Sequence, residues 1–120
     1  MDRHTPVSCG RMKLVKCIVR PDSVAGVICA LESFGVSGVT VLDVRGRGKR
    51  TRPTGDFRGR TYERCLPMSM LEIVAADEVV DDVVSVVIEH TRTGKCGDGR
   101  VLVIPIEEGY SIRTRQCGAA

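Results

Sequence analysis

The chain has 120 residues, which is enough for one domain with a modest core. Aromatic residues make up only 3% of it and Trp is absent, so the core must consist of Val, Ile and Leu. No apolar run approaches the roughly 18 residues that a membrane-spanning helix needs, and His4 and His90 lack the spacing of metal ligands. We therefore expect a cytoplasmic protein with no membrane segment and no structural metal site.

The net charge of +3 conceals a strongly basic segment. Residues 45–64 contain eight Lys and Arg residues against Asp56 and Glu63, while acidic residues outnumber basic ones in the rest of the chain. The six cysteines are scattered, with no C-x-x-C pair and no signal peptide before them. We expect ordinary reduced thiols, and a redox role for Cys65, Cys96 or Cys117 stays an open alternative.

The first part of the chain predicts a strand, a helix and a second strand. Residues 1–11 show no periodicity and are expected to be a flexible leader. Residues 13–20 alternate between two faces, as a strand does, and residues 39–44 form the second strand. Between them, Asp22 or Ser23 is expected to cap a helix. Its apolar stripe repeats at helical spacing: Val24, Val27, Ile28, Leu31 and Phe34.

The second part repeats this order after a long interruption. Glycine and proline punctuate residues 46–67, where we expect an irregular loop, and loops of that length are generally functional or disordered. Residues 68–75 are predicted to form a strand and residues 101–106 another. Asp77 is expected to cap the helix between them. The apolar stripe of this helix consists of valines: Val80, Val83, Val84 and Val87.

This order of elements predicts an α+β fold, a ferredoxin-like βαββαβ sandwich with a long loop between its second and third strands. The strands at 68–75 and 101–106 are apolar on both faces, yet two helices can cover only one face of a sheet. The other face would remain a large exposed apolar patch unless another chain covered it. We therefore expect an oligomer packed through the sheets.

A glycine-rich turn, T-G-K-C-G-D-G-R at residues 93–100, lies between the second helix and the last strand. Its backbone amides, together with Lys95 and Arg100, are suitable groups for holding an oxyanion. It is not a Walker loop, because it precedes a strand and lacks that spacing. From these residues alone, a plain turn with a glycine after the helix is the alternative.

With these features in place, the chain resembles the PII signal-transduction proteins from about Met12 to Gly118. The residues 93–100 match the family's carboxy-terminal signature loop, although Leu102 stands where an aromatic residue is usual. Further similar stretches are G-V-T-V-L-D-V-R-G-R-G at 38–48, Leu66-Pro67, L-E-I-V-A-A-D at 71–77 and E-E-G-Y-S-I-R-T at 107–114.

The resemblance implies a homotrimer that binds ATP, ADP or AMP in the clefts between subunits, with Mg²⁺ as a candidate companion of the nucleotide. It implies one domain at 12–120, with a phosphate loop at 93–100 and a carboxy-terminal tail at 107–120. Ser111 stands where a second phosphate-contacting arginine is often found. The nucleotide-binding residues carried over from the family are Thr40, Gly46, Arg47, Gly48, Lys49, Glu72, Val74, Gly97, Asp98, Gly99, Arg100 and Arg113.

The basic segment would be the T-loop, at about residues 46–67, with which the family docks on a regulated partner protein. Tyr62 falls on the tyrosine that some members nucleotidylate. Thr61, however, replaces the acidic neighbour of that tyrosine, so an unmodified loop residue is the alternative for Tyr62.

Two departures from the family concern its small anionic effector. The family binds 2-oxoglutarate with a glutamine and a lysine, whose places are taken here by Arg50 and Met68. A smaller anion such as bicarbonate would suit this altered site, as in the PII-like proteins associated with carboxysomes. The candidate anion-binding residues are Arg47, Gly48, Lys49 and Arg50.

Two other classes of function are alternatives to a regulator of nitrogen or carbon metabolism. The basic loop 45–64 would suit a nucleic acid, but Phe57 and Tyr62 are its only aromatic residues for stacking on bases. An ATPase would need a general base near the phosphate loop, and none is evident, because Asp98 is better placed to hold the turn. We therefore expect a regulator rather than an enzyme, and regard nucleic acid as an unfavoured partner.

Overall fold

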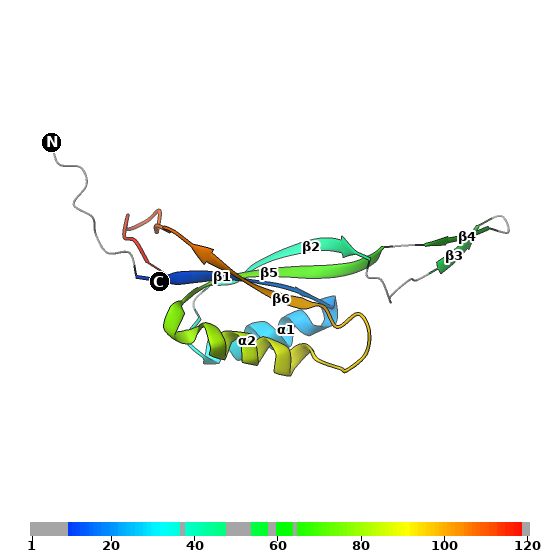
Figure 1. The fold of residues 1–120 in the computed structure, drawn as a ribbon, viewed down its shortest axis with the longest axis horizontal. Coiled ribbons are helices and arrows are strands. Elements are labelled where there is room, and N and C mark those ends of the chain that lie inside the picture. The colour runs from blue at the N-terminus through cyan, green and yellow to red at the C-terminus, as the bar shows by residue number, and fades with distance from the viewer. Residues whose placement is uncertain (1–9, 37, 48–53, 58–59, 64, 119–120) are drawn as a thin grey trace.

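The computed structural model describes residues 10–36, 38–47, 54–57, 60–63 and 65–118. Its centre is a four-stranded antiparallel sheet in the order β2-β5-β1-β6, covered on one face by two helices (Figure 1). The strands are β1 (Met12–Val19), β2 (Thr40–Gly46), β5 (Leu66–Ala76) and β6 (Arg100–Ile106). This arrangement confirms the expected α+β ferredoxin-like sandwich.

β1 lies in the interior of the sheet and sets its register. Val15 pairs with Ile73 of β5 and Val103 of β6, while Lys16 pairs with Glu72 and Leu102. Because successive side chains of a strand point to opposite faces, Val15 faces the helices and Lys16 faces away from them. The three side chains that β1 contributes to the core on the helix side are fully or almost fully buried: Val15, Cys17 and Val19.

The helices α1 (Val24–Ser33) and α2 (Asp77–Thr91) close this core. The predicted stripes are confirmed, since their central members are buried: Val27, Leu31, Val80, Val83 and Val87. Phe34 was wrongly placed in the first stripe. It follows the last turn of α1 and its side chain is 43% exposed.

Both expected helix caps were wrong. The short 3-10 helix η1 (Pro21–Ser23) precedes α1, so Ser23 has helical dihedral angles and its side chain makes no capping hydrogen bond. A capping side chain normally needs an extended backbone at this position. Asp77 is the first residue of α2 rather than its cap, and it forms an ion pair with Lys13 at 2.7 Å.

The expectation of an irregular loop throughout residues 46–67 was also wrong. Within it, β3 (Thr54–Phe57) and β4 (Arg60–Glu63) pair as an antiparallel hairpin that projects beyond the end of the sheet (Figure 1). Phe57 pairs with Arg60, so two residues separate the strands. A hairpin with such a short connection forms by pairing between residues close in the sequence. The glycines and prolines of this segment indicated a loop, so the two short strands were not recognised.

The face of the sheet opposite the helices carries exposed apolar side chains from three strands: Leu42, Val74, Leu102 and Ile104. They belong to the same side as Lys16 by their register. The oligomer expected to cover this face remains a prediction. None of the helices in the described part of the chain is long and apolar enough to cross a membrane.

One cysteine differs from the expectation of reduced thiols. Cys117 is disulfide-bonded, whereas Cys17, Cys29, Cys65 and Cys96 are free. The tail folds back on itself, with Tyr110 and Cys117 forming an isolated bridge between antiparallel segments, and this folding holds Cys117 in place. Pairing of this kind depends on three-dimensional proximity, which scattered sequence positions do not reveal.

Candidate functional site

The loop at residues 93–100 is held in shape by the carboxylate of Asp98. Oδ2 of Asp98 accepts hydrogen bonds from the amides of Thr93 at 2.8 Å and Gly94 at 2.9 Å, and Oδ1 accepts one from the Thr93 hydroxyl. The Thr93 hydroxyl, the backbone amides and the guanidinium of Arg20 lower the pKa of Asp98, despite an opposing contribution from desolvation. Asp98 is therefore a structural acceptor, as the sequence suggested.

The loop also lies directly against β1. Gly99 has a φ of +108°, and a Cβ atom there would lie 1.8 Å from the carbonyl oxygen of Ile18. Gly94 and Gly97 have positive φ as well. Glycine is thus required at position 99 by both the backbone conformation and the contact with the strand.

Arg20, just after the end of β1, reaches across to the same loop. Its Nε donates to the carbonyl of Gly97 at 3.1 Å and its Nη2 donates to the carbonyl of Cys96 at 2.8 Å. Nη2 also lies 3.4 Å from Oδ1 of Asp98. Sequence reasoning missed this residue, because a single arginine before Pro21 looks like any strand end.

The predicted nucleotide-binding residues that the structure brings together form two groups, one on the open sheet face and one at the loop that leads into β6. Thr40 of β2 pairs directly with Glu72 of β5, and Val74 follows Glu72 on the same face. Glu72 is also 3.9 Å from Nζ of Lys16. Arg100 begins β6, where it pairs with Ile18.

These two groups lie toward opposite edges of one sheet. β2 and β6 are the edge strands, so three strand spacings of ~4.8 Å place them roughly 14 Å apart. The structure therefore brings Thr40, Glu72 and Val74 together, and it brings Gly97, Asp98, Gly99 and Arg100 together, but it keeps the two groups apart within one chain.

The remaining predicted residues are only partly described. Gly46 ends β2, where a Cβ would contact Cγ of Met68 at 3.6 Å, and Arg47 follows it. Arg113 is exposed in the folded tail. Gly48, Lys49 and Arg50 lie outside the described residues. Tyr62 lies in β4, but its side chain is outside the described part.

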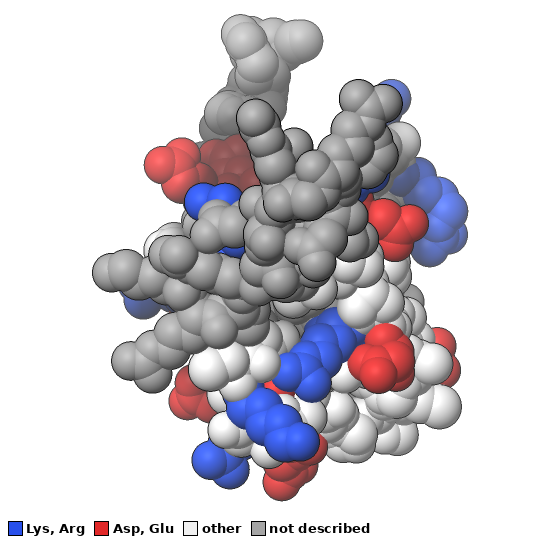
Figure 2. Space-filling view, turned by 90° about the vertical axis from the view of Figure 1, so that its right-hand side faces the viewer, with Lys and Arg blue, Asp and Glu red and all other residues white. Residues whose placement is uncertain are grey.

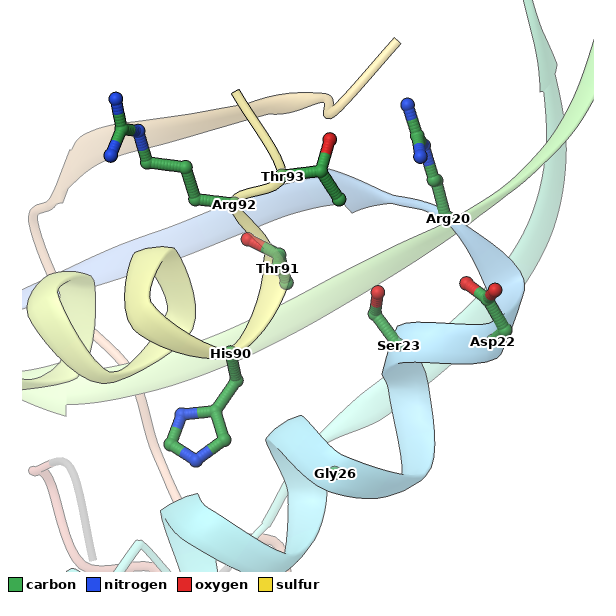
Figure 3. A pocket seen from close by; sticks show the side chains of 8 residues that line it. All are labelled: Arg20, Asp22, Ser23, Gly26, His90, Thr91, Arg92 and Thr93. Atoms are coloured by element: carbon green, nitrogen blue, oxygen red, sulfur yellow. The ribbon is translucent and has the colours of Figure 1, made fainter. Parts of the chain in front are cut away.

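Two pockets adjoin the phosphate loop. One, of about 400 Å³, lies between the loop and the start of β5, and its lining is Arg20, Pro21, Asp22, Leu66, Pro67, Met68, Cys96 and Gly97. The other, of about 290 Å³, lies between the start of α1 and the end of α2 (Figure 3). Its lining includes Ser23, His90 and Thr91, and the Arg92 side chain is directed away from its centre.

The face seen from the hairpin end shows no large patch of one charge below the undescribed atoms (Figure 2). Figure 2 views the molecule from the hairpin end, and below the undescribed atoms the basic and acidic side chains are intermingled. Among the described residues there is no group of three or more His, Cys, Asp or Glu side chains that could hold a metal ion.

Comparison with known proteins decides the family. Residues 12–116 match the sequence profile of the family described as Nitrogen regulatory protein P-II. The chain belongs to the PII family. PII proteins are regulatory proteins rather than enzymes.

The relatives of this PII protein are similar over nearly their whole length. It is 41% identical over 108 residues to "Nitrogen regulatory protein P-II 2" of Methanothermobacter thermautotrophicus. The aligned residues cover 89% of this chain and 94% of the relative. It is 39% identical over 107 residues to "Nitrogen fixation nifHD region GlnB-like protein 1" of Methanobacterium ivanovii, which covers 89% and 99%.

A solved structure confirms the family fold. The crystal structure of Arabidopsis thaliana PII bound to citrate is similar with a TM-score of 0.74 and 33% sequence identity, covering 91% of this chain and 90% of that one. The similarity therefore extends over nearly the whole of both chains.

Proposed function

We propose that this PII protein binds ATP, ADP or AMP at the loop 93–100, in clefts between the subunits of a cytoplasmic homotrimer. The observation that carries the proposal is the construction of that loop. Asp98 closes it, Gly99 packs it on β1 and Arg100 leads out of it into β6. A glycine-rich loop held in a fixed shape presents backbone amides, and an adjacent guanidinium adds bidentate donors, which together suit a polyphosphate.

The position of the two residue groups supports a site shared between copies. The phosphate loop leads into one edge strand, while Thr40 belongs to the other, on a face with exposed apolar side chains. We propose that copies pack through this face in a closed ring, so that the loop of one copy meets the Thr40–Glu72–Val74 group of the next. The nucleotide would then lie in the cleft, with Arg113 reaching its phosphates from the tail and Mg²⁺ accompanying it.

We further propose that the T-loop hairpin controls a partner protein in nitrogen or carbon metabolism. The hairpin β3–β4 projects from the body of the chain, as a docking arm does (Figure 1). Both relatives named above have nitrogen regulation or nitrogen fixation in their names. Because Thr61 stands where the family has an acidic residue, control by ligands is the favoured route, with modification of Tyr62 as the alternative.

The second ligand is proposed to be a small anion, either bicarbonate or 2-oxoglutarate, held by Arg47, Gly48, Lys49 and Arg50. Met68 supplies no charge for a distal carboxylate, which favours the smaller anion. The Arabidopsis relative was crystallised with citrate, so polycarboxylates belong in the test.

The test is a calorimetric titration of ATP, ADP and AMP, alone and with bicarbonate, 2-oxoglutarate or citrate. We expect one nucleotide site per chain, and a weakening of ATP binding by about tenfold or more in Arg100→Ala, because charge-assisted hydrogen bonds are lost. Arg92→Ala is the matched control, since this exposed arginine lies close in sequence but outside the loop. Absence of nucleotide binding by the unmodified protein would refute the proposal.

A further inference from the structure

Arg20 contacts the loop 93–100, and neither the family motif nor the sequence pattern explains these contacts. Its guanidinium bonds to two consecutive carbonyls, of Cys96 and Gly97, and approaches the carboxylate of Asp98. These contacts join Arg20 to residues that lie 76 to 78 positions further along the chain. Such a planar fork of donors can fix several acceptors in one arrangement, which a lysine cannot do.

The consequence for the loop follows from the geometry of the peptide bond. In a planar trans peptide, the C=O of one residue and the N–H of the next point in opposite directions. Since the carbonyls of Cys96 and Gly97 point to Arg20, the amides of Gly97 and Asp98 point to the other side of the loop. Gly97 has a φ of +89°, and turns with such a left-handed residue form concave groups of amides that bind anions.

The charge of Arg20 matters as well. The Asp98 carboxylate lies inside a loop proposed to hold phosphates, and an uncompensated negative charge there would repel them. Arg20 lies 3.4 Å from this carboxylate, with its side chain about one-third exposed at 33%. It therefore offsets the negative charge on the side of the loop opposite the amides.

We propose that Arg20 is a positioning residue that pre-forms the anion-binding side of loop 93–100. It orients the amides of Gly97 and Asp98 and offsets the charge of Asp98, without itself contacting the nucleotide. This role rests on the proposed function of the loop as a phosphate site. Arg20 also lies in the lining of both pockets beside the loop, so direct contact with an anion is the competing role that the experiment must separate.

The experiment compares Arg20→Gln and Arg20→Lys with the unmodified protein by ATP titration at several salt concentrations. We expect both variants to bind ATP about tenfold more weakly or worse, because the lysine restores charge without the fork. The salt dependence of affinity should stay unchanged, because the number of cations touching the phosphates is the same. Arg92→Gln, which alters an arginine lining one of the same pockets but directed away from its centre, should leave the affinity unchanged.

A shallower salt dependence in Arg20→Gln would show direct contact with the anion and overturn the positioning role. Full affinity in either variant would overturn it too. A second readout needs no nucleotide: hydrogen exchange of the Thr93 and Gly94 amides, which donate to the Asp98 carboxylate, should accelerate about tenfold or more in ligand-free Arg20→Gln. Unchanged exchange would overturn the proposal about Arg20. Absence of ATP binding in the unmodified protein, with accelerated exchange in the variant, would instead refute the proposed function alone.

Discussion

At the scale of single residues, the phosphate loop depends on interactions that fix its backbone. Asp98 accepts three hydrogen bonds from Thr93 and Gly94, and Gly99 approaches the backbone of β1 more closely than any side chain would allow. The glycines and the aspartate were identifiable in the sequence, because the motif places them in a turn. Their contacts with Ile18 and Arg20 were not, since these residues lie in and just after a strand far away in the chain.

The substitution Gly99→Ala should destabilise the protein strongly. A Cβ at this position would lie 1.8 Å from the carbonyl oxygen of Ile18, and the φ of +108° is strained for alanine. We expect a loss of about 3 kcal/mol or more in the free energy of unfolding, measured by urea denaturation. Gly26→Ala is the control: it lies in α1 with nothing within 4 Å of its Cβ, so it should gain about 0.5–1 kcal/mol. Equal effects of the two would contradict the described loop geometry.

Asp98 should make stability depend on pH in the acidic range. Its pKa is lowered in the folded protein, first by the Thr93 hydroxyl and then by the backbone amides and Arg20. A carboxyl with a lowered folded pKa stabilises the protein above its ordinary pKa of about 3.9, and this stabilisation is lost as the pH falls through the folded value. Thermal unfolding between pH 7 and 2 should thus show a weaker acid dependence in Asp98→Asn. An identical dependence would show that Asp98 is not specifically stabilised.

At the scale of elements, hydrophobic periodicity was sufficient to predict a helix or strand wherever that element packs one face on the core. The strands, the valine-rich α2 and the stripe of α1 were predictable for this reason, despite the preference of valine for strands. The hairpin β3–β4 was not predicted, because it lies in a segment rich in glycine and proline and its backbone projects beyond the end of the sheet (Figure 1). The expected helix caps were wrong because η1 gives Ser23 helical dihedral angles, and because Asp77 is already the first residue of α2, where it pairs with Lys13.

The packing of α1 gives a prediction at this scale. Leu31 is fully buried between the helices and the sheet, whereas Ile88 of α2 is 43% exposed. Leu31→Ala should cost about 2–5 kcal/mol of unfolding free energy, because it leaves a cavity in the core. Ile88→Ala should stay within about 1 kcal/mol. Guanidinium denaturation of both variants would measure the difference, and similar losses would contradict the assigned core.

At the scale of the whole molecule, the open sheet face is the feature that one chain leaves unexplained. Leu102 on this face is 39% exposed and Ile88 on the helix layer is about equally exposed, at 43%. If copies pack through the sheets, Leu102→Glu would bury an added carboxylate beside Lys16 in the interface and should shift the protein from trimer toward monomer. Ile88→Glu should leave the trimer intact. Sedimentation velocity distinguishes these outcomes, and a trimer that is indifferent to Leu102→Glu would place the interface elsewhere.

The central claim is that each nucleotide site takes its phosphate loop from one copy and its sheet residues from another. It is tested most directly by mixing two variants, Arg100→Ala and Glu72→Ala, each expected to bind ATP weakly alone. After co-expression, roughly one cleft in four should combine an intact Arg100 with an intact Glu72 from its neighbour, because each cleft of a closed ring takes its two sides from different copies. We predict that tight ATP binding returns in that fraction of sites. Mixed trimers, verified by native mass spectrometry, that show no recovery would contradict the shared site.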